Sequence, residues 1–289
     1  MLIDTETKRI KLKDFRKWRN EMKRLDSEIG ELKQFIGRYE KDLLIRRRKL
    51  VLLVDLDQTL LHTSEADKVT NEGVFYYKLQ GDPSQRQFQT RFRPHTDIFL
   101  ENMSELFEMR ICTMGNREYA YKMASFMDKN GHYFADRITC REDIESPDSK
   151  TGLLNSLFPI GDHLVVIIDD QEDVWDWAPN LIGVKPYVYF GQAGTNHLND
   201  NDDYLLHLEG ILRTIHHNFF QAYDANSESA SLLHVKRFFP NILRRRVEKR
   251  GNPCQVPSER QTATSVACRH VDFVSVPPKI SWNYLCDSK

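Results

Sequence analysis

Two aspartates separated by one residue follow a short apolar run. The run is Leu50 to Val54, and Asp55 and Asp57 come directly after it. A leucine- and valine-rich run of this length, bounded by polar residues, is typical of a buried strand. Side chains at positions i and i+2 project to the same side, so the two carboxylates are expected to share one small volume. Such buried like charges require a cation, and Mg2+ is the usual one in phosphate chemistry. Two exposed loop aspartates are the alternative that this pair alone leaves open.

Other reactive side chains follow other predicted strands. Thr113 ends one strand, Asp169 and Asp170 follow a later one, and Lys150 lies in the connection between them. The carboxyl ends of parallel strands meet at one edge of a sheet, so these groups are expected to lie together with the first two aspartates. Mg2+ and Lys150 would neutralise phosphoryl oxygens, while the hydroxyl and adjacent N–H of Thr113 would orient them. A carboxylate attacking phosphorus would divide a slow hydrolysis into two easier steps.

The elements that must position these groups alternate between strand and helix through residues 50–224. This alternation predicts an α/β fold with a parallel sheet flanked by helices. The predicted elements are strands at 50–54, 107–113, 164–168 and 184–190, and helices at 96–105, 116–127 (capped by Asn116) and 202–223. Alternation over 74–79 and 87–92 predicts an inserted β-hairpin, and residues 64–90 are too few for a large cap domain.

Residues 1–49 are predicted to form a basic helical extension, with 16 Lys and Arg against 9 Asp and Glu. Apolar residues at intervals of three or four predict a helix within 8–49. They are Leu25, Ile29, Leu32, Ile36, Tyr39 and Leu43. We expect this stripe to dock on the body of the protein. Partner binding, or nuclear targeting through the basic cluster 46–49, is the alternative.

Charge and composition exclude several classes of protein. Residues 50–224 hold 14 Lys and Arg against 28 Asp and Glu, so a core that binds nucleic acid directly is not expected. No apolar stretch approaches the roughly 20 residues that span a bilayer, so no membrane association is expected. The five scattered cysteines form no C-x2-C pair and fit a reducing compartment. Residues 225–289 are basic and expected to be poorly ordered, apart from a predicted helix over 232–246.

Seven segments, in chain order, resemble one family. Asp55-Leu56-Asp57-Gln58-Thr59 matches the DxDx(T/V) signature of aspartate-nucleophile phosphatases in the haloacid dehalogenase superfamily. The segments are similar to the TFIIF-associating phosphatases of the RNA polymerase II C-terminal domain, and comprise residues 48–59, 92–94, 112–115, 149–152, 169–175, 184–187 and 202–205. The resemblance implies a three-layer haloacid-dehalogenase-like fold, with 50–224 as the phosphatase catalytic domain.

The resemblance also implies roles for individual residues. Asp55 would be the nucleophile, and Asp57 would protonate the departing serine oxygen and then activate water. Asp55, the Asp57 backbone carbonyl and Asp170 would hold Mg2+, while Asp169 would hold Lys150 and the metal waters. The residues expected to bind phosphate or substrate are Thr113, Met114, Lys150 and Arg93. Thr59 would brace the nucleophile loop, and Arg93 could alternatively form a structural ion pair.

The implied substrate is the phosphorylated C-terminal domain of RNA polymerase II, with TFIIF as a further partner and the nucleus as the location. Two departures bear on this. The family's third motif usually continues Asp-Asp-Arg, whereas Gln171 stands here, and no complete BRCT module follows the catalytic domain. A phosphatase of another nuclear phosphoprotein and a catalytically silent phosphopeptide-binding adaptor remain the alternatives.

Overall fold

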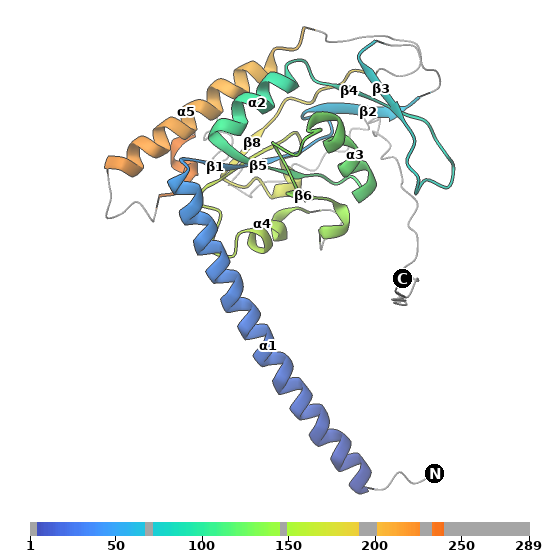
Figure 1. Cartoon of the computed structure of the whole chain (residues 1–289), viewed down its shortest axis with the longest axis vertical. Helices are drawn as coiled ribbons and strands as arrows, with labels where there is room; N and C mark the ends of the chain where they lie inside the picture. Colours follow the sequence, from blue (N-terminus) through green and yellow to red (C-terminus); the bar gives the residue numbers. More distant parts are fainter. Residues whose placement is uncertain (1–4, 67–71, 145–148, 191–200, 226–232, 240–289) are drawn as a thin grey trace, which may run out of the picture. The chain divides into compact units, whose positions relative to one another are not determined.

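A five-stranded parallel sheet forms the centre of the protein (Figure 1). The computed structural model describes residues 5–66, 72–144, 149–190, 201–225 and 233–239, with side chains from residue 14 onward. The sheet order is β6-β5-β1-β7-β8, and every neighbouring pair is parallel. The strands are β1 Leu50–Val54, β5 Phe107–Cys112, β6 Ile138–Thr139, β7 Val165–Asp169 and β8 Leu181–Gly183.

The two central strands, β1 and β7, are buried at every residue. β1 is apolar at every position and β7 at every position except its last, Asp169, so both strands need cover on both faces, which is the condition of a strand inside a helix-flanked parallel sheet. The covering helices are α2 Thr96–Leu106, α3 Arg117–Met127, α4 Thr151–Leu157 and α5 Tyr204–Ala225. Helices α2 and α5 pack side by side (Figure 1). The predicted α/β fold and the predicted Asn116 cap, whose side chain accepts from Tyr119 N, are confirmed.

A small antiparallel sheet is inserted between β1 and α2. It comprises β2 Leu61–Glu65, β3 Val74–Tyr77 and β4 Phe88–Phe92, in the order β2-β4-β3. The predicted hairpin is confirmed as β3 and β4, but β2 was not predicted. Its sequence, Leu-His-Thr-Ser-Glu, has one apolar residue and therefore no alternation. Apart from this insertion, the described residues between β1 and α2 form no cap domain.

The predicted strand 184–190 is wrong. The described strand in this region is β8, and the chain leaves the sheet after Val184 N donates to Asp169 O at 2.8 Å. Pro186 has no N–H to give to a ladder. Tyr187 N donates instead to Gln58 O at 2.7 Å, and the N–H groups of Tyr189 and Phe190 donate to His62 Nδ1. Side-chain alternation over these residues therefore reflects packing against the 57–62 segment.

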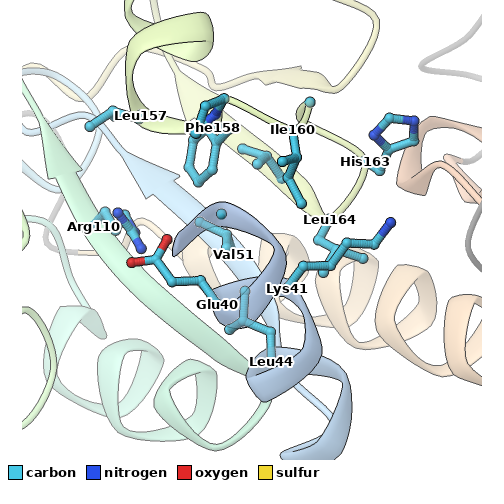
Figure 2. A pocket seen from close by; sticks show the side chains of 14 residues that line it. Glu40, Lys41, Leu44, Val51, Arg110, Leu157, Phe158, Ile160, His163 and Leu164 are labelled. Atoms are coloured by element: carbon cyan, nitrogen blue, oxygen red, sulfur yellow. The ribbon is translucent and has the colours of Figure 1, made fainter. Parts of the chain in front are cut away.

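The predicted N-terminal helix is α1, Thr5–Arg46. Its contacts with the sheet region come from its last turns, where Gln34 Nε2 donates to Pro159 O at 2.8 Å. A Cβ on Gly37 would lie 3.2 Å from Ile160. Side chains of α1, including Leu44, line one side of a cavity whose other side includes residues of the 157–165 segment (Figure 2). The expectation that the whole stripe docks is wrong, because its residues from Leu25 to Tyr39 are exposed.

Short 3-10 helices complete the described elements: Arg141–Asp143, Asp173–Trp175 and Val235–Phe238. The last of these lies within the predicted helix 232–246, and the rest of that prediction falls mostly outside the described residues. The prediction that residues 225–289 are poorly ordered likewise concerns residues that lie largely outside the described ranges. None of the described helices has the length and apolar character needed to cross a membrane.

Candidate active site

The carboxylates predicted from the strand ends meet at one edge of the sheet. Strands β1 and β7 are parallel neighbours with Val54 opposite Ile168. Asp55 follows β1 and its N–H donates to Ile168 O at 3.0 Å, so its side chain leaves the sheet beside that of Asp169, the last residue of β7. Gln58 then takes the left-handed conformation, with φ 60°, and turns the chain back toward the insertion.

Lys150 joins these two carboxylates. Its Nζ donates to Asp55 Oδ1 and to Asp169 Oδ2, each at 2.7 Å, and to Cys112 O at 3.1 Å. Its backbone N–H donates to Val174 O, which fixes the start of α4 over the site. Burial alone would lower the pKa of Lys150, but the two carboxylates raise it above its ordinary value. The residue is therefore a buried cation that stays charged in the folded protein.

Asp55, Asp169 and Asp170 form a cluster in which one carboxylate oxygen of each lies within 4.8 Å of one oxygen of each of the other two. Burial, and then the neighbouring Asp169, raise the pKa of Asp55 well above its ordinary value and that of Asp170 to about 7. Asp170 Oδ1 is buried and has no hydrogen-bond partner among the described residues. Lys150 supplies one positive charge to three carboxylates. An unpaired buried oxygen and excess negative charge are the features that a hard divalent cation would satisfy, so these residues fit such an ion.

Asp57 lies beside the cluster and has a partner that the motif did not reveal. Tyr119 Oη donates to Asp57 Oδ1 at 2.6 Å and also contacts Thr63 Oγ1 at 2.9 Å. The hydroxyl chain continues from Thr63 to Thr90 at 2.7 Å and from Thr90 to Tyr77 at 3.1 Å. Burial raises the pKa of Asp57 to about 6, despite the tyrosine, whose hydrogen bond favours the ionised form. This carboxyl group can therefore exchange a proton near neutral pH.

The remaining predicted residues occupy different places around the cluster. Thr113 N–H donates to Thr139 O in the ladder and is not available to a phosphate. Thr113 Oγ1 accepts from Gly115 N at 3.0 Å, which leaves the hydroxyl proton to donate. Met114, next along the chain, is half-buried. Thr59 is buried, and its hydroxyl has no hydrogen-bond partner among the described residues.

Each nitrogen of the Arg93 guanidinium group donates a hydrogen bond within the protein. Its Nε and Nη2 donate to the two carboxylate oxygens of Asp202, each at 3.0 Å. Its Nη1 donates to Thr59 O and Lys185 O, and the guanidinium lies 4.5 Å from the Tyr204 ring centroid. The residue is 1% exposed. This geometry favours the ion-pair alternative over a substrate contact, because the fork that would grip a phosphate already holds a carboxylate.

A comparison with known protein families shows to which family the chain belongs. Residues 50–224 match the family described as NLI interacting factor-like phosphatase. The chain belongs to this family.

Two relatives of the chain are named as phosphatases of the RNA polymerase II C-terminal domain. The human phosphatase of the RNA polymerase II C-terminal domain is 48% identical over 173 residues, which cover 59% of this chain and 18% of that protein. The protein of the same name from Caenorhabditis elegans is 38% identical over 220 residues, covering 70% of this chain and 33% of that protein. The chain thus spans a third or less of the length of these two relatives. A solved structure of the fission yeast RNA polymerase II CTD phosphatase Fcp1, bound to beryllium fluoride, matches with TM-score 0.64 and 28% identity, covering 72% of this chain and 74% of that one.

Two residues around the acidic cluster were not assigned to the site from sequence. Trp175 Nε1 donates to Asp169 Oδ2 at 2.7 Å and its ring lies 5.6 Å from Lys150 Nζ, so it helps to position the cluster. Tyr119 lies among the buried residues of α3. Both are large, amphipathic and buried, and helical periodicity reports burial without distinguishing a packed ring from one whose polar atom has a partner. Gln171, which replaces the family arginine, is exposed, and its backbone N–H donates to Asp169 Oδ1 at 2.9 Å.

Proposed function

We propose that this protein is a Mg2+-dependent protein serine phosphatase that forms an aspartyl-phosphate intermediate. We propose further that its substrate is the phosphorylated heptad-repeat C-terminal domain of RNA polymerase II. The observation that carries the proposal is the buried grouping of Asp55, Lys150 and Asp169 at the carboxyl edge of the sheet, with an unpaired Asp170 oxygen beside it. Residues 50–224 would be the catalytic unit, residues 1–49 a helical extension and residues 225–289 a tail.

In the first half-reaction, Asp55 attacks the phosphorus of a phosphoserine. Lys150 and the Thr113 hydroxyl would stabilise the negative charge on the phosphoryl oxygens as the P–O bond to serine breaks. Asp57 would transfer its proton to the departing serine oxygen, so that serine leaves as a neutral alcohol. A pKa near 6 suits this donor, because it is protonated often enough near neutral pH and gives up the proton readily.

In the second half-reaction, the same groups act in reverse. Asp57, now ionised, would take a proton from a water molecule that attacks the phosphorus of the acyl phosphate on Asp55. The P–O bond to Asp55 breaks, the carboxylate is restored and phosphate leaves. Tyr119 would hold Asp57 in one orientation through both steps, and Trp175 with Lys150 would do the same for Asp169.

The residues proposed to hold Mg2+ are Asp55, Asp170 and the backbone carbonyl of Asp57. A bound divalent ion supplies positive charge to the phosphoryl oxygens and lets several carboxylates remain ionised together. Asp169 would orient Lys150 and the water ligands of the ion. The half-buried Met114 would lie beside the phosphate.

The substrate assignment is supported by the names of the relatives. Proteins that share 38–48% identity with this chain are named as RNA polymerase II C-terminal domain phosphatases. With only a three-stranded insertion between β1 and α2 in the described residues, an extended peptide is a reasonable class of substrate. A substrate of this kind implies the nucleus as the location. TFIIF is a proposed partner, which a pull-down would test.

The catalytic assignment can be tested by comparing two substrates. Asp55→Asn should abolish turnover of both p-nitrophenyl phosphate and a phosphoserine heptad peptide, while Asp136→Asn at an exposed site should retain it. Asp57→Asn should reduce peptide turnover more than p-nitrophenyl phosphate turnover, because p-nitrophenolate needs little protonation to leave. Substantial turnover by the Asp55 variant would end the nucleophile assignment. Equal activity on unrelated phosphopeptides would refute the heptad preference and leave the chemistry standing.

The metal assignment has a readout that does not depend on turnover. Mg2+ at about 100 times its dissociation constant should stabilise the wild type by about 2.7 kcal/mol, measured as a rise in Tm. Asp170→Asn should show little of this rise, and Asp136→Asn should show all of it. An equal Mg2+ effect in both variants would place the ion elsewhere.

A further inference from the structure

The α1 helix carries an apolar stripe that no described residue covers. Eight side chains between residues 15 and 39 recur at alternating intervals of three and four. These residues, the α1 stripe, are Phe15, Trp18, Met22, Leu25, Ile29, Leu32, Ile36 and Tyr39, and each is 39–63% exposed. Strict alternation of three and four, with charged residues at most flanking positions, is the pattern of a two-helix coiled coil.

The helix contacts its own protein with a different face. Gly37 and Leu44, which are buried against the sheet region, lie seven residues apart and follow the positions of Ile36 and Leu43 by one residue. Glu40 lines the same cavity as Leu44 (Figure 2). The docked turns therefore overlap the end of the stripe in sequence and leave the stripe itself exposed. Intramolecular docking and pairing through the stripe are compatible.

We propose that the α1 stripe pairs with the α1 stripe of a second copy of this chain, as a parallel two-helix coiled coil. Each stripe residue would then face its own counterpart, and all eight side chains would fall in the seam. Burying one aromatic side chain covers about 150–250 Å², and a stable interface needs about 800 Å² per partner, so eight half-exposed side chains reach the required order.

The residue types in the middle of the stripe favour two helices over a larger parallel bundle. The spacing places Ile29 and Ile36 at the first apolar position of their heptads, and Leu25 and Leu32 at the second. β-branched residues at the first position with leucine at the second favour two parallel strands, because each shape fills the hole that this geometry offers. A second copy of the same chain supplies this pattern on both sides of the seam.

Charges that flank the seam agree with the parallel orientation. In a parallel coiled coil, residue i of one helix lies near residue i+5 of the other when residue i comes just before a first apolar position. Residue i+5 then comes just after the second apolar position of the same heptad. Three such pairs are charged, and the first two are attractive while the third is repulsive: Asp14 with Arg19, Glu28 with Lys33, and Glu21 with Asp26. Each pair occurs twice in a dimer, so attractive pairs outnumber repulsive ones two to one and the net charge interaction is favourable.

The acidic bodies that follow the helix oppose this arrangement in part. Residues 50–224 carry 14 Lys and Arg against 28 Asp and Glu, and a parallel pair brings two such bodies to the same end. Salt screens this repulsion, since the Debye length is about 8 Å at physiological ionic strength. Dimerisation should therefore be measured at about 0.15 M salt or above.

Sedimentation velocity of the full chain over a range of concentrations tests the pairing. The wild type should form a dimer, and Ile29→Glu should weaken dimerisation at least tenfold because it places a charge in the seam. Ser27→Glu, which adds the same charge on the opposite side of the helix, should dimerise like the wild type. Circular dichroism should show equal helix content in both variants. A wild type that stays monomeric at every concentration would overturn the proposal and indicate that another segment or protein covers the stripe.

Cysteine crosslinking tests the orientation. In a parallel dimer, each Leu25 faces Leu25 of the second copy, so Leu25→Cys should form a disulfide-linked dimer under mild oxidation, well above the wild-type level. Ser27→Cys, on the opposite side of the helix, should remain at the wild-type level. A Leu25→Cys variant that crosslinks only when mixed with Ile29→Cys would refute the parallel arrangement.

Discussion

The hydroxyl group of Tyr119 donates to Asp57 Oδ1 at 2.6 Å, and the tyrosine oxygen also contacts Thr63 Oγ1 of the inserted sheet at 2.9 Å. The tyrosine is on α3 and the aspartate follows β1, 62 residues apart in the chain. This contact links the proposed acid–base residue to both the helix layer and the insertion. In the proposed mechanism it would hold the carboxyl group of Asp57 in one orientation while the protonation state of that group changes.

Tyr119→Phe should therefore move the pH optimum of turnover upward. The lost hydrogen bond favours the ionised carboxylate, so its removal should raise the pKa of Asp57 above about 6. A hydrogen bond to a charged group contributes about 1.5–3 kcal/mol, so kcat should fall roughly tenfold or more. The measurement is a pH–rate profile, with Tyr121→Phe, an exposed tyrosine on the same helix, as the control. An unchanged optimum would argue that the contact is only structural.

Lys150→Met should destabilise the protein as well as inactivate it. Asp55 and Asp169 would be left buried without their cation, and removing one partner of a buried ion pair costs about 3–5 kcal/mol. Urea unfolding in the absence of metal should show this loss, and Lys129→Met, at an exposed site, should not. Adding Asp169→Asn to Lys150→Met should recover part of the stability without recovering activity. A fully stable Lys150→Met variant would contradict the ion-pair account of this residue.

Arg93→Lys separates the two roles considered for this residue. A lysine cannot reproduce the two parallel hydrogen bonds to Asp202 or the contact with the Tyr204 ring. We expect a loss of about 2–3 kcal/mol in the free energy of unfolding, with KM for p-nitrophenyl phosphate unchanged. Asp202→Asn should cause a similar loss, and the double variant should lose less than the sum. A large rise in KM with unchanged stability would restore the substrate-contact interpretation.

His62 should make stability depend on pH. Its Nδ1 accepts the backbone N–H groups of Tyr189 and Phe190, and burial lowers its pKa below the ordinary value of 6.5. The unfolded chain therefore binds a proton at a higher pH than the folded one. The contribution of His62 is complete above pH 6.5 and is lost as the pH falls toward its folded pKa.

His62→Gln retains an acceptor but cannot titrate, so it should flatten the fall in Tm between about pH 7.5 and about pH 5.5. The difference from wild type at low pH should be about 1–2 kcal/mol. His207→Gln, at an exposed position, is the control. An identical pH dependence of Tm in wild type and His62→Gln would assign the acid sensitivity to other groups.

Much of the fold could be predicted because the apolar composition of the central strands indicates that both of their faces are buried. A run such as Leu50 to Val54 is apolar at each position only if both faces are covered, and the alternation with helices then determines the parallel sheet. The errors arose where that signal fails. Strand β2 is too polar to show a period, and the segment 184–190 alternates because it packs on the 57–62 segment.

By itself, the sequence determined which chemical groups stand at the strand ends, and hence the acidic edge with Asp55, Asp169 and Asp170. Only the tertiary structure decided which partner each group takes. Lys150 reaches Asp55 across 95 residues of chain, and Arg93 reaches Asp202 across 109. The apolar residues of the α1 stripe can likewise be recognised from the sequence, but whether they are exposed depends on which face of the helix contacts the sheet region. Periodicity records how a residue is buried locally, whereas partners are set by contacts between segments far apart in the chain.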